Sequence, residues 1–318
     1  MRGLSRQLRG LLATGGALAA LPGTVGAQTT EMVQCLKDPS SIDCLAVPGG
    51  TRAPPPQWSL GVSGGIAPRD GGPTGSYESL TLLRQLGRSY VQLGATHYYS
   101  QLDSGVPTVS STYGVGTIGF GGNYNNWVLD TYISYGRQNF GPVRFGNLSR
   151  PSTNITNSAY WAGGVSFGRM MAVSPRFVIT PTASATYAWS RLLRPTLGSE
   201  DFNSSEPTWT AAARLRLDWV PGHNRKSYIG LGAGLLWSNN ATSLIAGSSG
   251  WGGIGQTGDK DTMDALTSSH VHDVWFEIGP HASLAVTRSL RVEAIANRSF
   301  GLISGNGSTV TLGLRHSF

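Results

Sequence analysis

The sequence predicts an all-β fold in which about twelve antiparallel strands form an up-and-down barrel that spans a membrane. Three observations support it: segments that alternate apolar and polar residues, a low content of charge, and connections of alternating length. Only 13% of the 318 residues are charged, below the roughly 25% of soluble domains. After residue 27, no apolar run approaches the roughly 20 residues of a spanning helix. Without such a helix, a chain crosses lipid only as a closed barrel.

Residues 1–27 have the pattern of a secretory signal peptide. Three arginines precede an apolar run at 11–21, and small residues at 25–27 offer a cleavage site before Gln28. These arginines contribute to the net charge of +7. No basic tract or aromatic RNA-binding motif accompanies that charge, so we expect no nucleic acid partner.

Residues 28–57 form a short segment of different character before the barrel. It contains the two cysteines of the chain, Cys35 and Cys44, which we expect to form a disulfide in an oxidising periplasm. Two thiols without a nearby His fall short of a zinc site, so we expect no metal and no other cofactor. The segment is either an ordered periplasmic tail or a small plug in the lumen.

Residues 58–318 divide into twelve predicted strands, each identified by alternation of period two. The clearest has Trp209, Leu215 and Trp219 on one face and Arg214 and Asp218 on the other. The fourth strand is ambiguous, because its apolar residues change face near its middle. The predicted strands cover 58–67, 76–86, 88–100, 109–121, 127–140, 158–172, 176–191, 207–219, 227–239, 270–287, 290–300 and 308–318.

The connections after even-numbered strands are short, and most of those after odd-numbered strands are longer. The longest are 141–157, 192–206 and 240–269. Outer-membrane barrels have short periplasmic turns and long external loops, so we expect both termini in the periplasm. A slip of one strand would disturb this pattern, and ten or fourteen strands remain alternatives.

The alternation separates residues that face lipid from residues that face the lumen. An aromatic girdle at the two lipid interfaces is predicted from Trp58, Trp127, Trp189, Trp209, Trp219 and Trp237. The predicted lumen-lining residues are Asp130, Arg214, Arg216, Asp218, Asp273, Glu277, Arg291, Glu293 and Arg315. Charges of both signs either pair and brace the barrel or line a wet pore.

The last strand carries an end signal. Val310, Leu312 and Leu314 share one face, and the chain stops at Phe318. This pattern resembles the closing strand of bacterial outer-membrane barrels, although His316 stands where that family more often has Tyr. The resemblance implies that the barrel-assembly machinery reads the terminal Phe. It also implies a location in the bacterial outer-membrane bilayer, with periplasmic chaperones as further partners.

Three segments carry further motifs: Trp127-Val-Leu-Asp-Thr-Tyr-Ile-Ser-Tyr-Gly136, the Ile-Thr-Pro strand from Phe177 followed by Glu200, and the closing strand. Each resembles a strand of autotransporter translocator domains, the barrels of type V secretion, and the three occur in the same order as in that family. The resemblance implies export or surface presentation of an N-terminal polypeptide through or beside the barrel. However, about 30 residues precede the barrel here, whereas autotransporters carry hundreds, so the passenger is vestigial, supplied by another chain, or absent.

Two other functions compete with export. A passive or gated porin-like channel for small solutes fits the small polar lumen residues, such as Thr182 and Ser184. An outer-membrane lipid hydrolase would use His281 and Ser283, with Glu293 on the next strand. The alternation places His281 and Ser283 toward the lumen, away from a lipid substrate. We therefore assign no catalytic residue and expect no enzyme activity.

Overall fold

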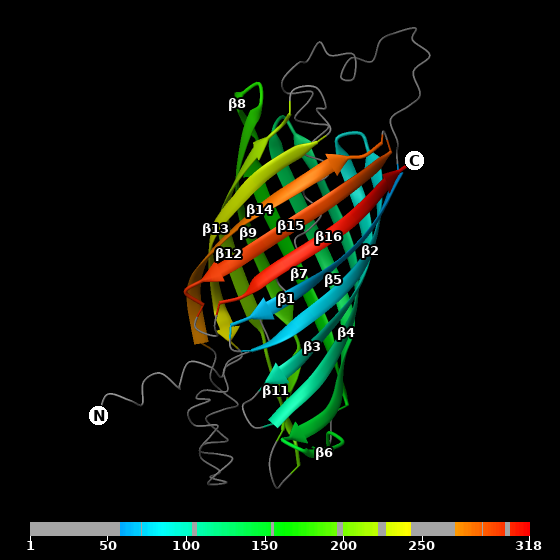
Figure 1. The fold of residues 1–318 in the computed structure, drawn as a ribbon, viewed down its shortest axis with the longest axis vertical. Helices are drawn as coiled ribbons and strands as arrows, with labels where there is room; N and C mark the ends of the chain where they lie inside the picture. The colour runs from blue at the N-terminus through cyan, green and yellow to red at the C-terminus, as the bar shows by residue number, and fades with distance from the viewer. Residues whose placement is uncertain are drawn as a thin grey trace, which may run out of the picture.

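Twelve long strands form one closed antiparallel barrel in the computed structural model (Figure 1). The structure describes residues 58–70, 72–103, 107–153, 156–195, 200–221, 227–242, 271–287, 289–302 and 306–318. Neighbouring strands follow one another in the sequence, and β16 pairs with β1 to close the sheet. The predicted all-β barrel and its strand number are confirmed. The described part of the chain contains no helix long and apolar enough to cross a membrane.

The barrel strands are β1 (Trp58–Arg69), β2 (Gly72–Leu86), β3 (Ser89–Asp103), β4 (Pro107–Tyr124), β5 (Trp127–Phe145), β7 (Asn157–Arg169), β9 (Phe177–Trp189), β12 (Thr208–Trp219), β13 (Tyr228–Thr242), β14 (Val271–Ala285), β15 (Leu290–Phe300) and β16 (Ser308–Ser317). Four short strands are added to them: β6 (Leu148–Arg150), β8 (Met171–Ser174), β10 (Arg191–Arg194) and β11 (Phe202–Ser205). β6 pairs with β5, β8 pairs with β9, and β10 pairs with β11.

The two ends of the barrel differ in the connections that they carry. We call the end that holds Trp58 and Phe318 the terminal rim and the opposite end the loop rim. Trp58 and Phe318 exchange backbone hydrogen bonds of 3.2 and 2.9 Å, and Figure 1 shows the C-terminus beside the start of β1. The terminal rim carries short turns, such as the two-residue turn in which Asn125 and Asn126 both have positive φ. The long connections 190–207 and 243–270 belong to the loop rim, as the sequence predicts.

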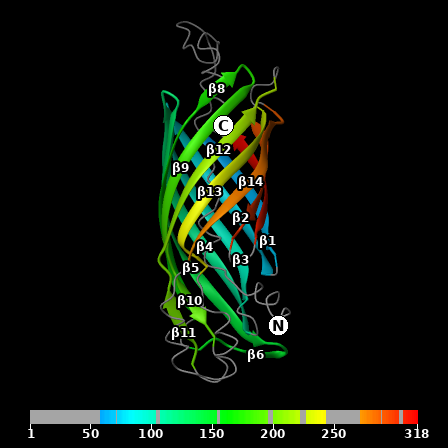
Figure 2. The same ribbon diagram turned by 90° about the vertical axis from the view of Figure 1, so that its left-hand side faces the viewer.

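The loop rim extends beyond the barrel wall on one side. β4 and β5 have 18 and 19 residues, longer than the predicted 109–121 and 127–140. Figure 2 shows β6, β10 and β11 gathered beside this extension, while β8 projects from the opposite end. The loop rim is therefore partly built from regular structure.

The outer face of the barrel is apolar along most of its strands. On β12, Trp209, Leu215 and Trp219 are exposed, while Asp218 is buried on the inner face. A hydrophobic outer face with polar groups inside is what a lipid-facing barrel requires.

The ambiguous strand β4 changes character along its length. Val109, Tyr113 and Val115 are buried on the inner face, whereas Ile118 and Phe120 are 62% and 42% exposed on the outer face. A register shift against β5 lies between Val109 and Ser111. The apolar residues change face because the loop-rim half of β4 packs against other elements and the terminal-rim half faces lipid.

Candidate functional site

The inner face of the barrel is the candidate functional site, because it is where the charged residues of the strands gather. All nine predicted lumen-lining residues lie at inward positions of the alternating strands: Asp130, Arg214, Arg216, Asp218, Asp273, Glu277, Arg291, Glu293 and Arg315. The structure brings most of them into contact with one another or with aromatic side chains.

Asp218 belongs to a cluster of four side chains near the terminal rim. Arg216 Nε donates a hydrogen bond of 2.9 Å to Asp218 Oδ1, and His281 Nε2 lies 2.7 Å from the same oxygen. The Arg216 guanidinium stacks 4.8 Å from the ring centroid of Tyr228. We call Arg216, Asp218, Tyr228 and His281 the Asp218 cluster. The charges of Asp218 and Arg216 compensate each other, and the contacts within the cluster link β12, β13 and β14.

A glycine on the strand between them allows Asp218 and His281 to meet. Gly230 of β13 pairs with Asp218 on one side and with His281 on the other. A Cβ atom at Gly230 would lie 2.7 Å from Asp218 Oδ1 and would also contact His281 Nε2. A residue without a side chain is therefore required for this contact across two strand spacings.

Two further pairs of opposite charge cross the same side of the lumen. Arg315 Nη2 donates to Glu293 Oε2 at 3.4 Å, and Arg214 Nη2 lies 3.7 Å from Glu277 Oε2. Glu277 also accepts a hydrogen bond of 3.0 Å from Trp275. Paired charges of both signs leave no large field of one sign on this wall.

Asp130 belongs to a separate contact on the wall formed by β3, β4 and β5. Tyr90 Oη donates a hydrogen bond of 2.5 Å to Asp130 Oδ1. The two side chains meet over Gly121, where a Cβ atom would lie 2.6 Å from the Tyr90 ring. The arrangement repeats that of Gly230, with an inward glycine between two polar residues.

The inner face also carries apolar side chains beside the charged ones. Near the terminal rim, a buried apolar cluster contains Val128, Met170, Val178, Val220 and Tyr228. Met170 and Val220 come from turns rather than strands, and Met170 is only 1% exposed. The backbone N–H groups of Met170 and Val220 donate hydrogen bonds of 2.8 Å to the carbonyl oxygens of Asn126 and Arg176, respectively. The side chains of Met170 and Val220 therefore pack inside this end of the barrel.

Toward the loop rim, three inward tyrosines form a second apolar group. Tyr98 and Tyr113 have ring centroids 6.0 Å apart, and Tyr113 and Tyr160 have centroids 6.2 Å apart, both in edge-to-face arrangements. Val115 and Ala162 complete the cluster. It narrows the lumen on the β3–β7 side.

The hairpin of β10 and β11 packs over the extension of β4 and β5. Leu193 is buried against Val109, Phe140 and Val143. Asp201, at the base of β11, receives a bond of 2.7 Å from Arg150 Nη1. That bond raises the pKa of the Arg150 guanidinium. The hairpin is thus held by both apolar and ionic contacts.

The Trp residues of the predicted girdle lie on the outer face at both ends of the barrel. Trp58, Trp127 and Trp219 lie toward the terminal rim, and Trp189, Trp209 and Trp237 lie toward the loop rim. Trp161 of β7, which is 42% exposed, also lies on the outer face and was not among the predicted girdle residues. Trp161 lies on the same face of the strand as Val165 and Phe167, and this apolar face could have predicted its outward position. The girdle role remains a prediction.

Arginines stack on several of these aromatic rings, and these contacts were not predicted from the sequence. The guanidinium carbon of Arg84 lies 5.2 Å from the ring centroid of Trp58, and that of Arg169 lies 5.2 Å from the ring centroid of Trp127. Both pairs lie at the terminal rim. Such pairs suit the boundary between lipid tails and headgroups.

The predicted assembly residues and the cysteines differ in what the structure shows. Val310, Leu312, Leu314 and Phe318 are 43%, 62%, 49% and 60% exposed on the outer face or at the chain end. Their recognition stays a prediction. The signal peptide and the Cys35–Cys44 disulfide lie outside the described residues.

The residues considered for lipid hydrolysis do not form a catalytic arrangement. His281 directs Nε2 at Asp218, and Ser283 is fully buried at 0% exposure on the inner face. Ser283 Oγ has no hydrogen-bond partner among the described residues. No group of three or more His, Cys, Asp and Glu residues suited to a metal occurs in the described ranges.

These features define a twelve-stranded barrel of the outer-membrane type, with paired charges and aromatic clusters inside. No known family model and no curated protein sequence matches the chain. Three translocator structures share its fold. The translocator domain of autotransporter NalP from Neisseria meningitidis has a TM-score of 0.57 at 12% identity, covering 82% of this chain and 89% of that one. The β domain of the Bordetella autotransporter BrkA has a TM-score of 0.53 at 12% identity, covering 82% of this chain and 99% of that one. The transport unit of the autotransporter AIDA-I from Escherichia coli has a TM-score of 0.51 at 13% identity, covering 92% of this chain and 99% of that one. The predicted resemblance to translocator barrels is confirmed for the fold.

Proposed function

We propose that this protein is an integral barrel of the bacterial outer membrane that exports a polypeptide to the cell surface or presents it there. The observation that carries the proposal is the closed twelve-stranded fold, which three translocator structures share. The polypeptide enters at the terminal rim, where β1 begins at Trp58. The passenger is the segment before the barrel or a polypeptide supplied by another chain.

The terminal rim faces the periplasm in this proposal. It carries the short turns, whereas the long connections and the β10–β11 hairpin lie at the loop rim. Outer-membrane barrels keep short turns in the periplasm and long loops outside. Export by the signal peptide and insertion by the assembly machinery, after handling by periplasmic chaperones, would give this orientation.

A fused passenger tests export. An unstructured peptide tag placed at Gln28 should become sensitive to protease added to intact cells. The same tag inserted at Arg88, in a terminal-rim turn, should stay protected and serves as the control. Folding of both proteins is checked by their different gel migration before and after heating in SDS. A protected Gln28 tag on a folded barrel would show that the protein does not export its own N-terminus.

A solute channel is the second candidate, because paired charges and small polar residues line part of the lumen. The apolar clusters at both ends oppose a wide pore. Planar-bilayer recordings of the intact chain and of a chain lacking residues 28–56 separate an open pore, a plugged pore and a sealed barrel. Negligible conductance in both would remove the channel function.

We infer that the barrel has no hydrolase activity. The buried hydroxyl of Ser283 and the engagement of His281 with Asp218 support this inference. Ser283→Ala should leave the lipid composition of the membrane unchanged when the protein is overproduced. A phospholipid or lipid A product that appears with the unmodified chain and disappears with Ser283→Ala would contradict it.

A further inference from the structure

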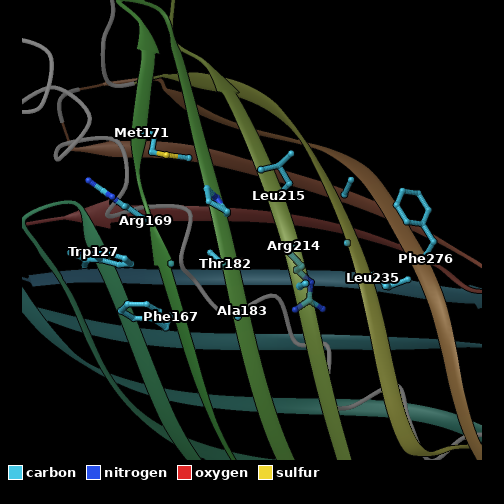
Figure 3. A pocket seen from close by; sticks show the side chains of 15 residues that line it. Trp127, Phe167, Arg169, Met171, Thr182, Ala183, Arg214, Leu215, Leu235 and Phe276 are labelled. Atoms are coloured by element: carbon cyan, nitrogen blue, oxygen red, sulfur yellow. The ribbon is translucent and has the colours of Figure 1, made fainter.

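The outer face of the barrel carries an apolar depression with a volume of about 680 Å³ (Figure 3). Its floor contains the small residues Ala183, Ala213 and Ala233 of three adjacent strands. Larger side chains border it, with Phe167 on one side and Phe276 on the other. The volume lies within the roughly 300–1,000 Å³ of small-molecule sites.

The depression follows from the cross-strand register. Phe167 pairs with Ala183, Ala183 pairs with Ala213, and Ala213 pairs with Leu235. Two alanines therefore stand side by side between aromatic and branched side chains that project from the same face. Phe167 is 49% exposed and Leu235 is 56% exposed. In a lipid-facing wall, such a trough is filled by an acyl chain, which gains dispersion contacts along it.

Two arginines, Arg169 and Arg214, line this trough, and Arg169 is the one that lies at its terminal-rim end, because Arg214 occupies an inward position in the middle of β12. The guanidinium of Arg169 stacks 5.2 Å from the ring centroid of Trp127. Trp127 in turn stacks on Phe167, with ring centroids 4.7 Å apart and planes inclined by 13°. No ion pair of Arg169 occurs among the residues that the structure describes. The stacked charge is therefore available to an anion at the level of the lipid headgroups.

We propose that this depression, which we call the Arg169 groove, binds an anionic glycerophospholipid. One acyl chain lies over Ala183 and Ala213, and the headgroup phosphate pairs with Arg169. Stacking on Trp127 restricts the arginine beforehand, which lowers the entropy lost on binding. The choice of a glycerophospholipid from the periplasmic leaflet rests on the orientation in the proposed function. Binding to the isolated barrel does not depend on that orientation.

Native mass spectrometry of the full chain, purified in detergent from outer membranes, tests the proposal. The protein is titrated with phosphatidylglycerol and with phosphatidylcholine of identical acyl chains. We expect the first phosphatidylglycerol to bind about fivefold more tightly, the factor that roughly 1 kcal/mol represents for one arginine near an anionic surface. Arg169→Gln should abolish the preference, and Ala213→Phe should weaken the binding of both lipids by filling the trough.

Two matched variants serve as controls, one for the loss of an arginine at the terminal rim and one for the addition of an aromatic ring to the outer face. Arg84→Gln removes another arginine stacked on a terminal-rim tryptophan, and Ala95→Phe adds a ring at an outward position outside the groove. Both should bind lipid as the unmodified chain does. The proposal is wrong if Arg169→Gln keeps the preference, if Arg84→Gln loses it equally, or if lipid A binds more tightly than phosphatidylglycerol. If Ala213→Phe does not fold, Ala183→Leu replaces it. Failure of the Gln28 export assay would leave these results unchanged.

Discussion

Asp218 shows how single residues determine the packing of the lumen. Its side chain is only 4% exposed, yet it carries two close partners, Arg216 and His281. A buried carboxylate is tolerated only where its charge is compensated. The compensation depends on Gly230, because the partner on β14 reaches across that residue.

Gly230→Ala should destabilise the barrel by about 1 to 3 kcal/mol, the usual effect of overpacking. The added methyl group would collide with the Asp218 carboxylate and with the Leu217 carbonyl group. Equilibrium unfolding in detergent, followed by tryptophan fluorescence, measures the change. Gly114→Ala is the control, since a Cβ atom there meets nothing within 4 Å. Equal stability of the two variants would mean that the close approach at Gly230 does not exist.

Phe318 is the residue on which the assembly prediction depends. Deletion of Phe318 should reduce insertion into the outer membrane at least severalfold, while secretion to the periplasm continues. The chain end is accessible at the terminal rim, with Phe318 60% exposed. Fractionation and heat-dependent gel migration measure insertion, and Phe300, 46% exposed on the neighbouring strand, offers Phe300→Ala as a control. Normal insertion of the chain that lacks Phe318 would mean that this residue has no role in assembly.

At the scale of elements, Leu193 provides an apolar contact that holds the β10–β11 hairpin on the barrel. Leu193→Ala should cost at least about 2 kcal/mol, which raises the open population of the hairpin roughly thirtyfold. External protease should then cut within 190–207 much faster, while the barrel keeps its resistance to SDS. Leu148→Ala is the matched control, because Leu148 is 74% exposed at the same rim. If both variants are cut at the same rate, the packing of Leu193 is not what holds the hairpin.

The long strands could be predicted from the sequence because lipid imposes the same alternation on every one of them. The short elements could not. β6, β8, β10 and β11 contain three or four residues each, too few to show a period. The extended part of β4 packs on a hairpin rather than on lipid, so the apolar residue Val109 faces inward there.

The site was predicted less completely than the strands. Inward positions follow from alternation, which is why Asp218 and Glu293 could be assigned to the lumen. Contacts between strands depend on the pairing register and on the conformation of the turns. Neither can be predicted from the residue pattern of a single strand. The inward packing of Met170 and Val220 was therefore missed, and so was the pairing of Asp218 with His281.

For the whole molecule, the proposed export function depends on the fold and on the orientation of the barrel in the membrane. The barrel closes between β1 and β16, which places both described ends at one rim. Export to the surface requires that this rim face the periplasm and that the loop rim face the outside. Orientation in the membrane is thus the claim on which the rest depends.

Labelling of single cysteines on intact cells tests that claim most directly. Cys35 and Cys44 are replaced by Ser, and a membrane-impermeant maleimide is applied to Asn147→Cys at the loop rim or Arg88→Cys at the terminal rim. Both positions lie in exposed turns. We predict labelling of Asn147→Cys on intact cells and of Arg88→Cys only after the outer membrane is permeabilised. Labelling of Arg88→Cys on intact cells, with Asn147→Cys protected, would contradict the account.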